Sequence, residues 1–226
     1  MAHSVLVIAD SGSGKSTSIR DLDPKETFII NIANKPLPFK GWKKNYTAIS
    51  KDNPKGNMTP VSSAAGIMKA MMHVNDKMPH IKNLVVDDWQ YMSSFEYFDR
   101  ADEKGYDKFT SIAKNLAQVA KMPKDMRDDL YIFFLTHSEE STDVNGHRKV
   151  KAKTVGKMID NALTLEGLFS IVLFGKVVKG EDDKLSYVFE TVNNGENTCK
   201  SPDGMFDDAR IDNSLKVVKD AIIEYE

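Results

Sequence analysis

Near its amino terminus the chain reads VLVIADSGSGKST, residues 5–17. The first four residues form a short, continuous apolar run, which is typical of a strand buried on both faces of a parallel sheet. The run breaks into a turn rich in glycine and serine, and we expect a helix from Lys15 to Asp21. Apart from one position, the stretch matches the phosphate-binding pattern G-x-x-x-x-G-K-[ST]. It therefore predicts an α/β fold with a phosphate site at the end of the first strand.

The residue types of this loop suit phosphate chemistry. Glycine permits positive φ angles and lets the backbone N–H groups approach phosphate oxygens closely. Lys15 can reach β- and γ-phosphates, the Ser16 hydroxyl can bind Mg²⁺, and Thr17 can contact the α-phosphate. The one departure is Ala9, which replaces the first glycine and is tolerable if its φ stays negative; the alternative is a Gly/Ser turn that happens to precede a lysine. The predicted binding residues are Ser11, Gly12, Ser13, Gly14, Lys15, Ser16 and Thr17.

A second acidic motif supports this interpretation. The apolar run Leu84-Val85-Val86 ends in Asp87 and Asp88, the form of a Walker B strand that delivers a carboxylate to its carboxyl end. Asp87 is expected to hold Mg²⁺ together with Ser16, and Asp88 to orient or deprotonate the attacking water. The alternative is a helix N-cap, because aspartate is favoured there and residue 89 onward is expected to be helical.

A further polar residue follows the apolar strand predicted at Tyr131–Leu135. His137 lies at the tip of this strand, where a side chain can contact the γ-phosphate and respond to hydrolysis. The alternative is a capping or merely solvated histidine. The catalytic candidates are therefore Lys15, Asp88 and His137.

Strands alternate with helices through the first two-thirds of the chain, which predicts a mostly parallel sheet covered by helices on both faces. A late pair of strands separated by a charged glycine turn predicts an antiparallel hairpin extension at one edge. We expect one domain over residues 1–226. The other expected strands are 27–31, 46–50, 171–178 and 185–191, and the expected helices are 62–74, 89–122 in two pieces, 155–163 and 213–225.

Composition excludes several classes of protein. The 226 residues carry 31 Lys plus Arg and 33 Asp plus Glu, a net charge of −2, which excludes a uniformly basic coat. Cys199 is the single cysteine, and no Cys/His cluster has zinc-ligand spacing. The apolar runs are far shorter than the roughly 20 residues that span a bilayer. With no signal-peptide pattern at the start, we expect a cytoplasmic protein without a membrane partner.

The expected nucleotide is ATP. GTPases recognise guanine with Asn-Lys-x-Asp, and the Asn-Lys pair at residues 34–35 lacks the aspartate and lies too near the phosphate loop. Small-molecule kinases need a lid with arginines. The five arginines of this chain form no paired cluster, so a nucleotide kinase remains the weaker alternative.

The order of residues 9–17, 84–88 and 131–137 resembles the compact RecA-like P-loop ATPases encoded by bacteriophages, including the Sak-four group of single-strand annealing and recombination proteins. Residues 34–39 and 198–204 are also similar to phage members, so the resemblance covers about residues 4–206. It implies a Mg²⁺-dependent ATPase that binds single-stranded DNA, forms a homo-oligomer and works beside a single-strand binding protein in recombination or replication. One departure matters: RecA-type proteins carry a catalytic glutamate after the second strand, and residues 32–35 contain none. Either Asp88 substitutes for it or hydrolysis is slow.

The resemblance also suggests where DNA and a neighbouring subunit make contact. The loop after the third motif contacts DNA in RecA cores, and residues 147–157 hold five Lys and Arg, with the acidic residues expected elsewhere. The DNA candidates are Arg148, Lys149, Lys151 and Lys153, and the alternative is a solvated hairpin. Lys200 is the candidate for a cation supplied to a neighbour's site, in competition with Arg210 and Lys157. A second functional hypothesis is an ATPase that acts on a protein partner, as a helicase loader or a packaging protein.

Overall fold

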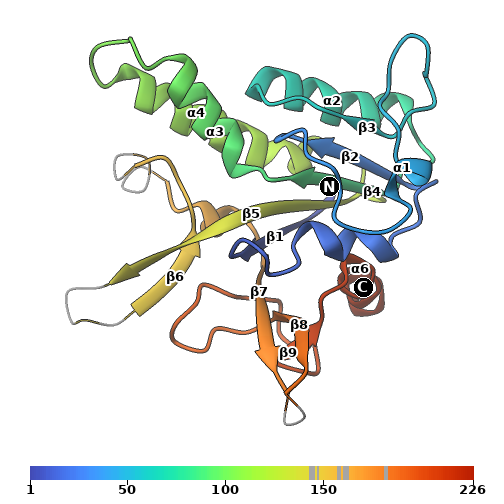
Figure 1. The fold of residues 1–226 in the computed structure, drawn as a ribbon, viewed down its shortest axis with the longest axis vertical. Helices are drawn as coiled ribbons and strands as arrows, with labels where there is room; N and C mark the ends of the chain where they lie inside the picture. The colour runs from blue at the N-terminus through green and yellow to red at the C-terminus, as the bar shows by residue number, and fades with distance from the viewer. Residues whose placement is uncertain (143–145, 147, 157–158, 160–162, 181–182) are drawn as a thin grey trace.

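The computed structural model describes residues 1–142, 146, 148–156, 159, 163–180 and 183–226. Within these residues, strands form one sheet in the order β3-β2-β4-β5-β1-β7-β8-β9, with β6 paired to β5 (Figure 1). The strands are β1 His3–Ala9, β2 Thr27–Asn31, β3 Met58–Thr59, β4 Asn83–Asp87, β5 Tyr131–Thr142, β6 Arg148–Ala152, β7 Ile171–Lys179, β8 Leu185–Glu190 and β9 Arg210–Asp212.

The sheet is mostly parallel. β3, β2, β4, β5, β1 and β7 run in one direction, whereas β8 and β9 continue the sheet in antiparallel pairs. β1 lies at the centre, with Val5 opposite Phe133 of β5 on one side and Ile171 of β7 on the other. The expected parallel sheet with a late antiparallel hairpin is thus confirmed.

Helices cover both faces of the sheet, which explains why β1, β2 and β4 are apolar without alternation. One hydrophobic cluster lies under α2 Ala64–Lys77, α3 Gln90–Asp99 and α4 Asp107–Lys121. The other lies under the 3₁₀ helix η1 Ser16–Asp21, α1 Trp42–Asn45 and α6 Leu215–Tyr225. Val5 and Val7 point into the second cluster, and Leu6 and Ile8 into the first. The remaining 3₁₀ turns are η2 Met122–Asp125 and η3 Leu165–Leu168.

The structure differs from the expectation at residues 46–50, which do not form a strand. Only Ala48 makes an isolated bridge, to Met58, and the edge strand β3 is Met58–Thr59. The side chain of Asn53 donates to the Ala48 carbonyl, and that of Asn57 accepts from the Thr47 amide and donates to the Asn45 carbonyl. These local bonds take backbone groups that a sheet ladder needs.

One other element departs from the expectation. β5 continues to Thr142 and forms a hairpin with β6, so the polar stretch after the apolar strand is β structure. The helix expected from Lys15 to Asp21 is present as the six-residue 3₁₀ helix η1, in which the Ser18 amide is shared between the Gly14 and Lys15 carbonyls. The helix expected at residues 155–163 lies largely outside the described residues.

The carboxyl ends of β1, β2 and β4 meet at one edge of the sheet, where the last residue of β1, Ala9, lies opposite His137 in the middle of β5. The chain leaves β1 toward the second cluster, through Ile19 and Leu22, and leaves β4 toward the first, through Trp89 and Met92. Connections that diverge to opposite faces leave a crevice at this edge, which is where open α/β sheets bind ligands. In the described part of the chain, no helix is long and apolar enough to cross a membrane.

Candidate functional site

The loop between β1 and η1 has the backbone that the sequence predicted. Gly12 and Gly14 both adopt left-handed conformations, with φ of 81° and 85°. Ala9 is absent from the positive-φ positions and lies fully buried at the end of β1. Its methyl group fits because Gly175 lies opposite; a Cβ at Gly175 would come within 2.8 Å of the Ala9 Cβ. The departure from the glycine pattern at Ala9 is therefore accommodated by the neighbouring strand.

The ammonium group of Lys15 is folded back over its own loop. Its Nζ donates to the carbonyls of Ala9 and Asp10, each at 2.9 Å. The side chain is buried, and burial lowers the Lys15 pKa from 10.5 to about 8, although the nearby aspartates oppose this. A phosphate could replace the two carbonyls as the partner of this cation.

Ser16 and Asp87 are in direct contact across the crevice. The Ser16 hydroxyl donates to Asp87 Oδ1 at 2.8 Å. Asp87 is 3% exposed, and burial, followed by repulsion from Asp88, raises its pKa from 3.8 to about 6. Removal of this carboxylate from water without a full cation partner is costly, so the position is unfavourable unless positive charge is supplied.

These two side chains fit a magnesium ion. A hydroxyl and a carboxylate are hard oxygen donors, and Mg²⁺ is usually held by one or two carboxylates together with substrate phosphates and water. Among the described residues, no group of three His, Cys, Asp or Glu side chains is placed to hold a metal ion. Two protein oxygens are fewer ligands than Mg²⁺ takes, so a metal held by Ser16 and Asp87 would need water or a bound phosphate as further ligands.

Asp88 lies in a strained and highly charged position. Its φ is 59°, a left-handed conformation that non-glycine residues rarely adopt. The carboxylate is 3.4 Å from His137 Nε2 and 2.5 Å from Lys35 Nζ. Burial favours the neutral acid, but the bonds from His137 and Lys35 outweigh it and hold the Asp88 pKa below its usual range. Neither this carboxylate nor that of Asp87 caps α3, whose N-terminus at Trp89 has no side-chain cap.

His137 connects the two halves of the site. Its Nδ1 is 3.4 Å from Lys15 Nζ and its Nε2 is 3.4 Å from Asp88. The His137 amide donates to Gln90 Oε1 at 2.9 Å, which fixes the end of the β5 apolar segment against α3. The histidine is thus neither free in solvent nor a simple cap, because it lies between a cation and a carboxylate.

Lys35 is a site residue that sequence reasoning missed. The buried Asn31 side chain clamps its backbone, donating to the Lys35 carbonyl at 2.6 Å and accepting from its amide at 3.2 Å. The Nζ also lies 5.6 Å from the centre of the Tyr91 ring. The signal that could have revealed it is its position just after β2, the strand paired with the one that carries Asp87.

A cleft of about 420 Å³ joins these groups, lined by Ser11, Gly12, Gly14, Lys15, Ser16, Thr17, Lys35, Pro38, Asp88, His137 and Tyr187. Ser13 is buried and lines a separate hollow on the other side of the loop. Tyr187 comes from β8, more than 170 residues along the chain from the phosphate loop. Asn213 supports the loop from beneath, with its Nδ2 3.5 Å from the Ser13 carbonyl. No local pattern around Tyr187 or Asn213 pointed to the cleft.

The expected DNA residues lie on the β5–β6 hairpin, which projects away from the rest of the sheet (Figure 1). The expectation that acidic residues lie elsewhere is wrong. Glu140 pairs with Arg148, and Glu139 lies 3.0 Å from Lys151 Nζ. These carboxylates come from β5, so antiparallel pairing places them beside the cations of β6. Lys149 and Lys153 form no ion pair with a described residue.

The candidates for a cation in trans do not line the cleft of this chain. Lys200 makes two backbone bonds with Val172 of β7 and has an exposed side chain. Arg210 is paired with the buried Glu190 at 3.1 Å. Lys157 lies outside the described residues.

Comparison with known proteins gives no relative from which a role could be transferred. No protein-family model matches the sequence, and no curated protein matches it significantly. The chain is therefore defined as an α/β protein with a mostly parallel sheet, flanking helices and a charged cleft at the carboxyl ends of its strands. This arrangement is compatible with a P-loop-like fold.

Proposed function

We propose that the chain is a RecA-like P-loop ATPase that uses Mg²⁺ and ATP. One observation supports this most strongly: Lys15, Ser16 and His137 line one cleft, and the Asp87 carboxylate lies directly against Ser16. Each residue type matches a requirement of phosphate binding, and these residues were identified from three separate motifs. A glycine turn beside an isolated lysine would give no reason for Asp87 to lie against Ser16.

The roles follow from the contacts. The backbone of Gly12 and Gly14 and the ammonium of Lys15 bind phosphate oxygens, and Ser16 with Asp87 holds the metal. When bound, Mg²⁺ neutralises charge on the β- and γ-phosphate oxygens. The buried Lys15 ammonium and the buried Asp87 carboxylate are both placed to bind groups of opposite charge, a phosphate and a metal ion.

The second half of the site contains Asp88, Lys35 and His137. Because hydrogen bonds from His137 and Lys35 hold the pKa of Asp88 down, its carboxylate is suited to orient a water molecule more than to accept a proton. Lys35 supplies positive charge within the same chain, opposite Lys15, where the γ-phosphate develops charge. With no glutamate after β2 and a weak base at Asp88, slow hydrolysis is expected.

Action on single-stranded DNA in phage recombination or replication is part of the proposal, together with homo-oligomer formation and Lys200 as the cation in trans. Support comes from the projecting hairpin, where Lys149 and Lys153 remain available for backbone phosphates. The neighbouring Glu139 and Glu140 favour the second candidate, an ATPase that acts on a protein partner. Stimulation of ATP turnover by single-stranded DNA separates the two candidates.

Replacement of Lys15 by alanine tests the nucleotide site. Binding of a fluorescent ATP analogue with Mg²⁺ is measured for the wild type, for Lys15→Ala and for Lys69→Ala, which removes an exposed lysine on α2. Binding should be lost in Lys15→Ala and unchanged in Lys69→Ala. Equal affinity in all three proteins would remove the basis of the proposed function.

A further inference from the structure

A basic surface lies at the other end of the sheet, around the amino ends of β2 and β4. Residues 36–55 contain five lysines and one acidic residue, Asp52. Lys40, Lys43, Lys44, Lys51 and Lys55 are all exposed, and none of them forms an ion pair with a described residue. This differs from the β5–β6 hairpin, where glutamates face the cations.

Two of these lysines, together with Lys25, gather around one hollow of about 480 Å³. Lys25, Lys44 and Lys55 line it together with His80, so four separate segments of the chain contribute. The remaining lining residues are Asp23, Pro24, Asn45, Asn57 and Ile81. Asp23 is the one carboxylate among them, and its Oδ1 accepts the backbone amide of Lys25 at 2.9 Å.

The loop that carries these lysines is held in place. Asn57 donates to the carbonyls of Pro24 and Asn45, at 2.9 and 3.0 Å, and so joins two sides of the hollow. Gly56 packs so closely on Ala48 that a Cβ there would lie 2.5 Å from its backbone. A fixed backbone reduces the entropy lost when the lysines bind a ligand.

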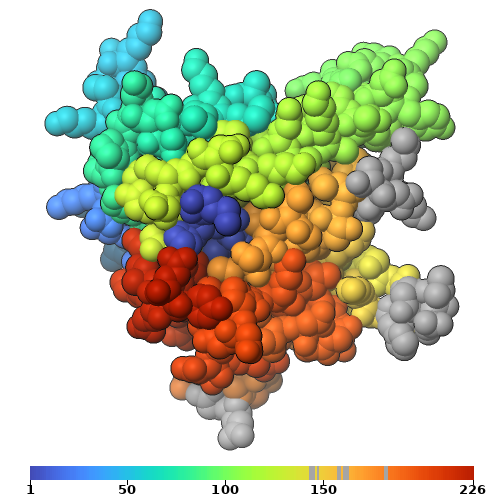
Figure 2. Space-filling model, turned by 180° about the vertical axis from the view of Figure 1, so that it is seen from behind, coloured from blue at the N-terminus to red at the C-terminus, as the bar shows by residue number. Residues whose placement is uncertain are grey.

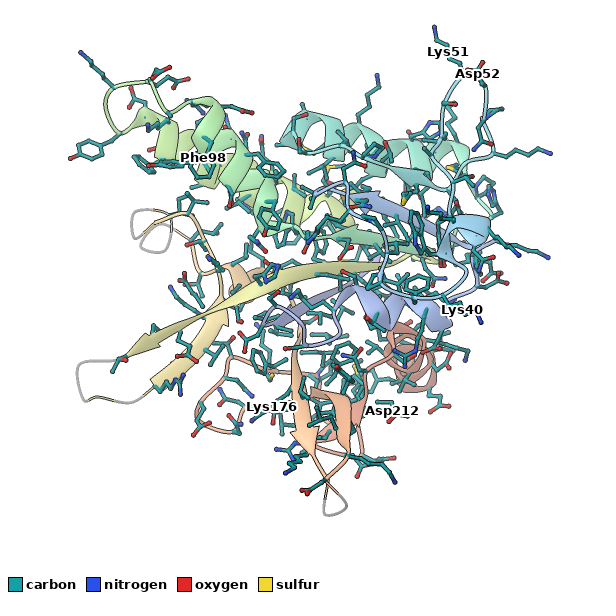
Figure 3. The ribbon with its side chains drawn as sticks, viewed as in Figure 1. Lys40, Lys51, Asp52, Phe98, Lys176 and Asp212 are labelled. Carbon is teal, nitrogen blue, oxygen red and sulfur yellow. The ribbon has the colours of Figure 1, made fainter. Side chains whose placement is uncertain are left out.

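The positive charge extends beyond the hollow. Figure 3 places Lys51 at the tip of the projecting loop and Lys40 lower on the same end of the molecule. In Figure 2 the light-blue segment around residue 50 protrudes at one corner. Charge spread over this length suits a chain of phosphates better than a single phosphate.

Apolar contact, which a membrane or a protein interface needs, is missing from this surface. Among the described residues, the exposed large hydrophobic side chains all lie outside residues 23–82. Interfaces with nucleic acid are polar and strongly basic, and they draw their affinity from phosphate contacts. The chemistry of the surface therefore favours a nucleic-acid backbone.

We infer that the hollow lined by Lys25, Lys44 and Lys55 binds the backbone phosphates of single-stranded nucleic acid. This inference rests on the proposed action on single-stranded DNA, but it does not depend on nucleotide binding. It places the main DNA contact at the amino ends of the parallel strands, away from both the cleft and the β5–β6 hairpin.

The test is a titration of fluorescein-labelled oligothymidine across salt concentrations. Each phosphate contact to a single strand contributes a slope of about 0.7 in log affinity against log salt, so three contacts contribute about 2. The wild type should lose about 20-fold more affinity between 50 and 200 mM salt than the triple variant Lys25→Ala, Lys44→Ala, Lys55→Ala. Two matched variants remove three charges elsewhere: Arg148→Ala, Lys149→Ala, Lys153→Ala on the hairpin, and Lys69→Ala, Lys114→Ala, Lys121→Ala on α2 and α4.

The inference is supported if, of the three variants, only Lys25→Ala, Lys44→Ala, Lys55→Ala has a smaller slope of log affinity against log salt than the wild type. This variant should also keep the melting temperature and the ATP affinity of the wild type. It is overturned if the hairpin variant carries the loss, if all three variants lose equally, or if the wild type binds no oligothymidine. Binding to acidic phospholipid vesicles in place of DNA would also overturn it. ATP affinity is measured on the same samples and tests the proposed ATPase separately. A failure of DNA binding can therefore be distinguished from a failure of nucleotide binding.

Discussion

Asp87 and Asp88 are adjacent in sequence, yet their replacement by asparagine should change stability in opposite directions. Burial and the neighbouring Asp88 raise the Asp87 pKa from 3.8 to about 6, so the folded protein binds a proton there more tightly than the unfolded chain does. Stability contributed by this proton is present at low pH and is lost as the pH rises through about 6. A pKa difference of this size corresponds to about 3 kcal/mol at pH 8.

Asp87→Asn removes the free-energy cost of burying an ionised carboxylate, because the amide is neutral at every pH. Its oxygen can still accept from Ser16, so the 2.8 Å hydrogen bond has a replacement. We therefore expect the variant to be more stable than the wild type by up to about 3 kcal/mol at pH 8, with most of the difference lost by pH 4 and the rest lost below the unfolded-state pKa of 3.8. The same variant should bind Mg²⁺ and ATP poorly, the usual conflict between stability and function.

Asp88→Asn is the matched control. Asparagine tolerates the left-handed conformation, so the φ of 59° is no obstacle. Because bonds from His137 and Lys35 hold the Asp88 pKa low, this carboxylate stabilises the fold at neutral pH, and that contribution disappears as the pH falls below the pKa of the unfolded state. Asp88→Asn should therefore destabilise the protein at pH 8.

Urea unfolding of the three proteins between pH 4 and 8 measures both effects. The difference between each variant and the wild type cancels the titration of distant groups. Asp88→Asn also removes the repulsion that raises the Asp87 pKa, which offsets part of its loss of stability. If both variants lose stability at pH 8, or if the Asp87→Asn difference does not change with pH, the assignment of a costly buried charge at Asp87 is refuted.

Three further predictions concern the cleft. Nucleotide affinity of the free protein should fall as the pH rises through about 8, the lowered pKa of Lys15, and a flat profile from pH 7 to 9.5 would contradict the burial of this cation. Lys35→Ala should reduce kcat by about 100-fold in a phosphate-release assay, while ATP affinity changes less. Lys35→Arg should recover part of the lost kcat. An unchanged kcat in Lys35→Ala would exclude Lys35 from charge stabilisation. Gly14→Ala should lower Tm and ATP affinity more than Gly12→Ala. Both substitutions strain a positive φ, but only the Gly14 Cβ would lie 3.0 Å from Asn213 and Tyr187. Equal losses in the two variants would mean that the packing beneath the loop is irrelevant.

The fold was predictable where its signals are local. Continuous apolar runs at β1, β2 and β4 gave the buried parallel strands, since a strand covered on both faces needs no polar side chain. Residues 46–50 and the long β5 were not predictable, because asparagine side chains and cross-strand pairing with β6 decided their backbone bonds. Neither the asparagine bonds to the backbone nor the pairing with β6 can be read from the residues of these segments alone.

The sequence by itself determined the candidate phosphate loop and the acidic residue predicted to lie opposite it. Gly12, Gly14, Lys15 and Ser16 lie within five consecutive positions, so spacing alone defines their chemistry. Asp87 was identifiable because an apolar strand that ends in a carboxylate delivers it to a known edge of the sheet.

Only the tertiary structure decided how these groups are charged and what surrounds them. Strand pairing placed Lys35 beside Asp88 and put His137 between that carboxylate and Lys15. It brought Tyr187 to the cleft, placed Glu139 and Glu140 beside the hairpin cations, and gathered three lysines from distant segments around one hollow. The physical reason is common to all of them. The strength of an electrostatic interaction depends on the distance between the charges and on their burial. The register of the sheet decides which residues, tens of positions apart in sequence, become neighbours.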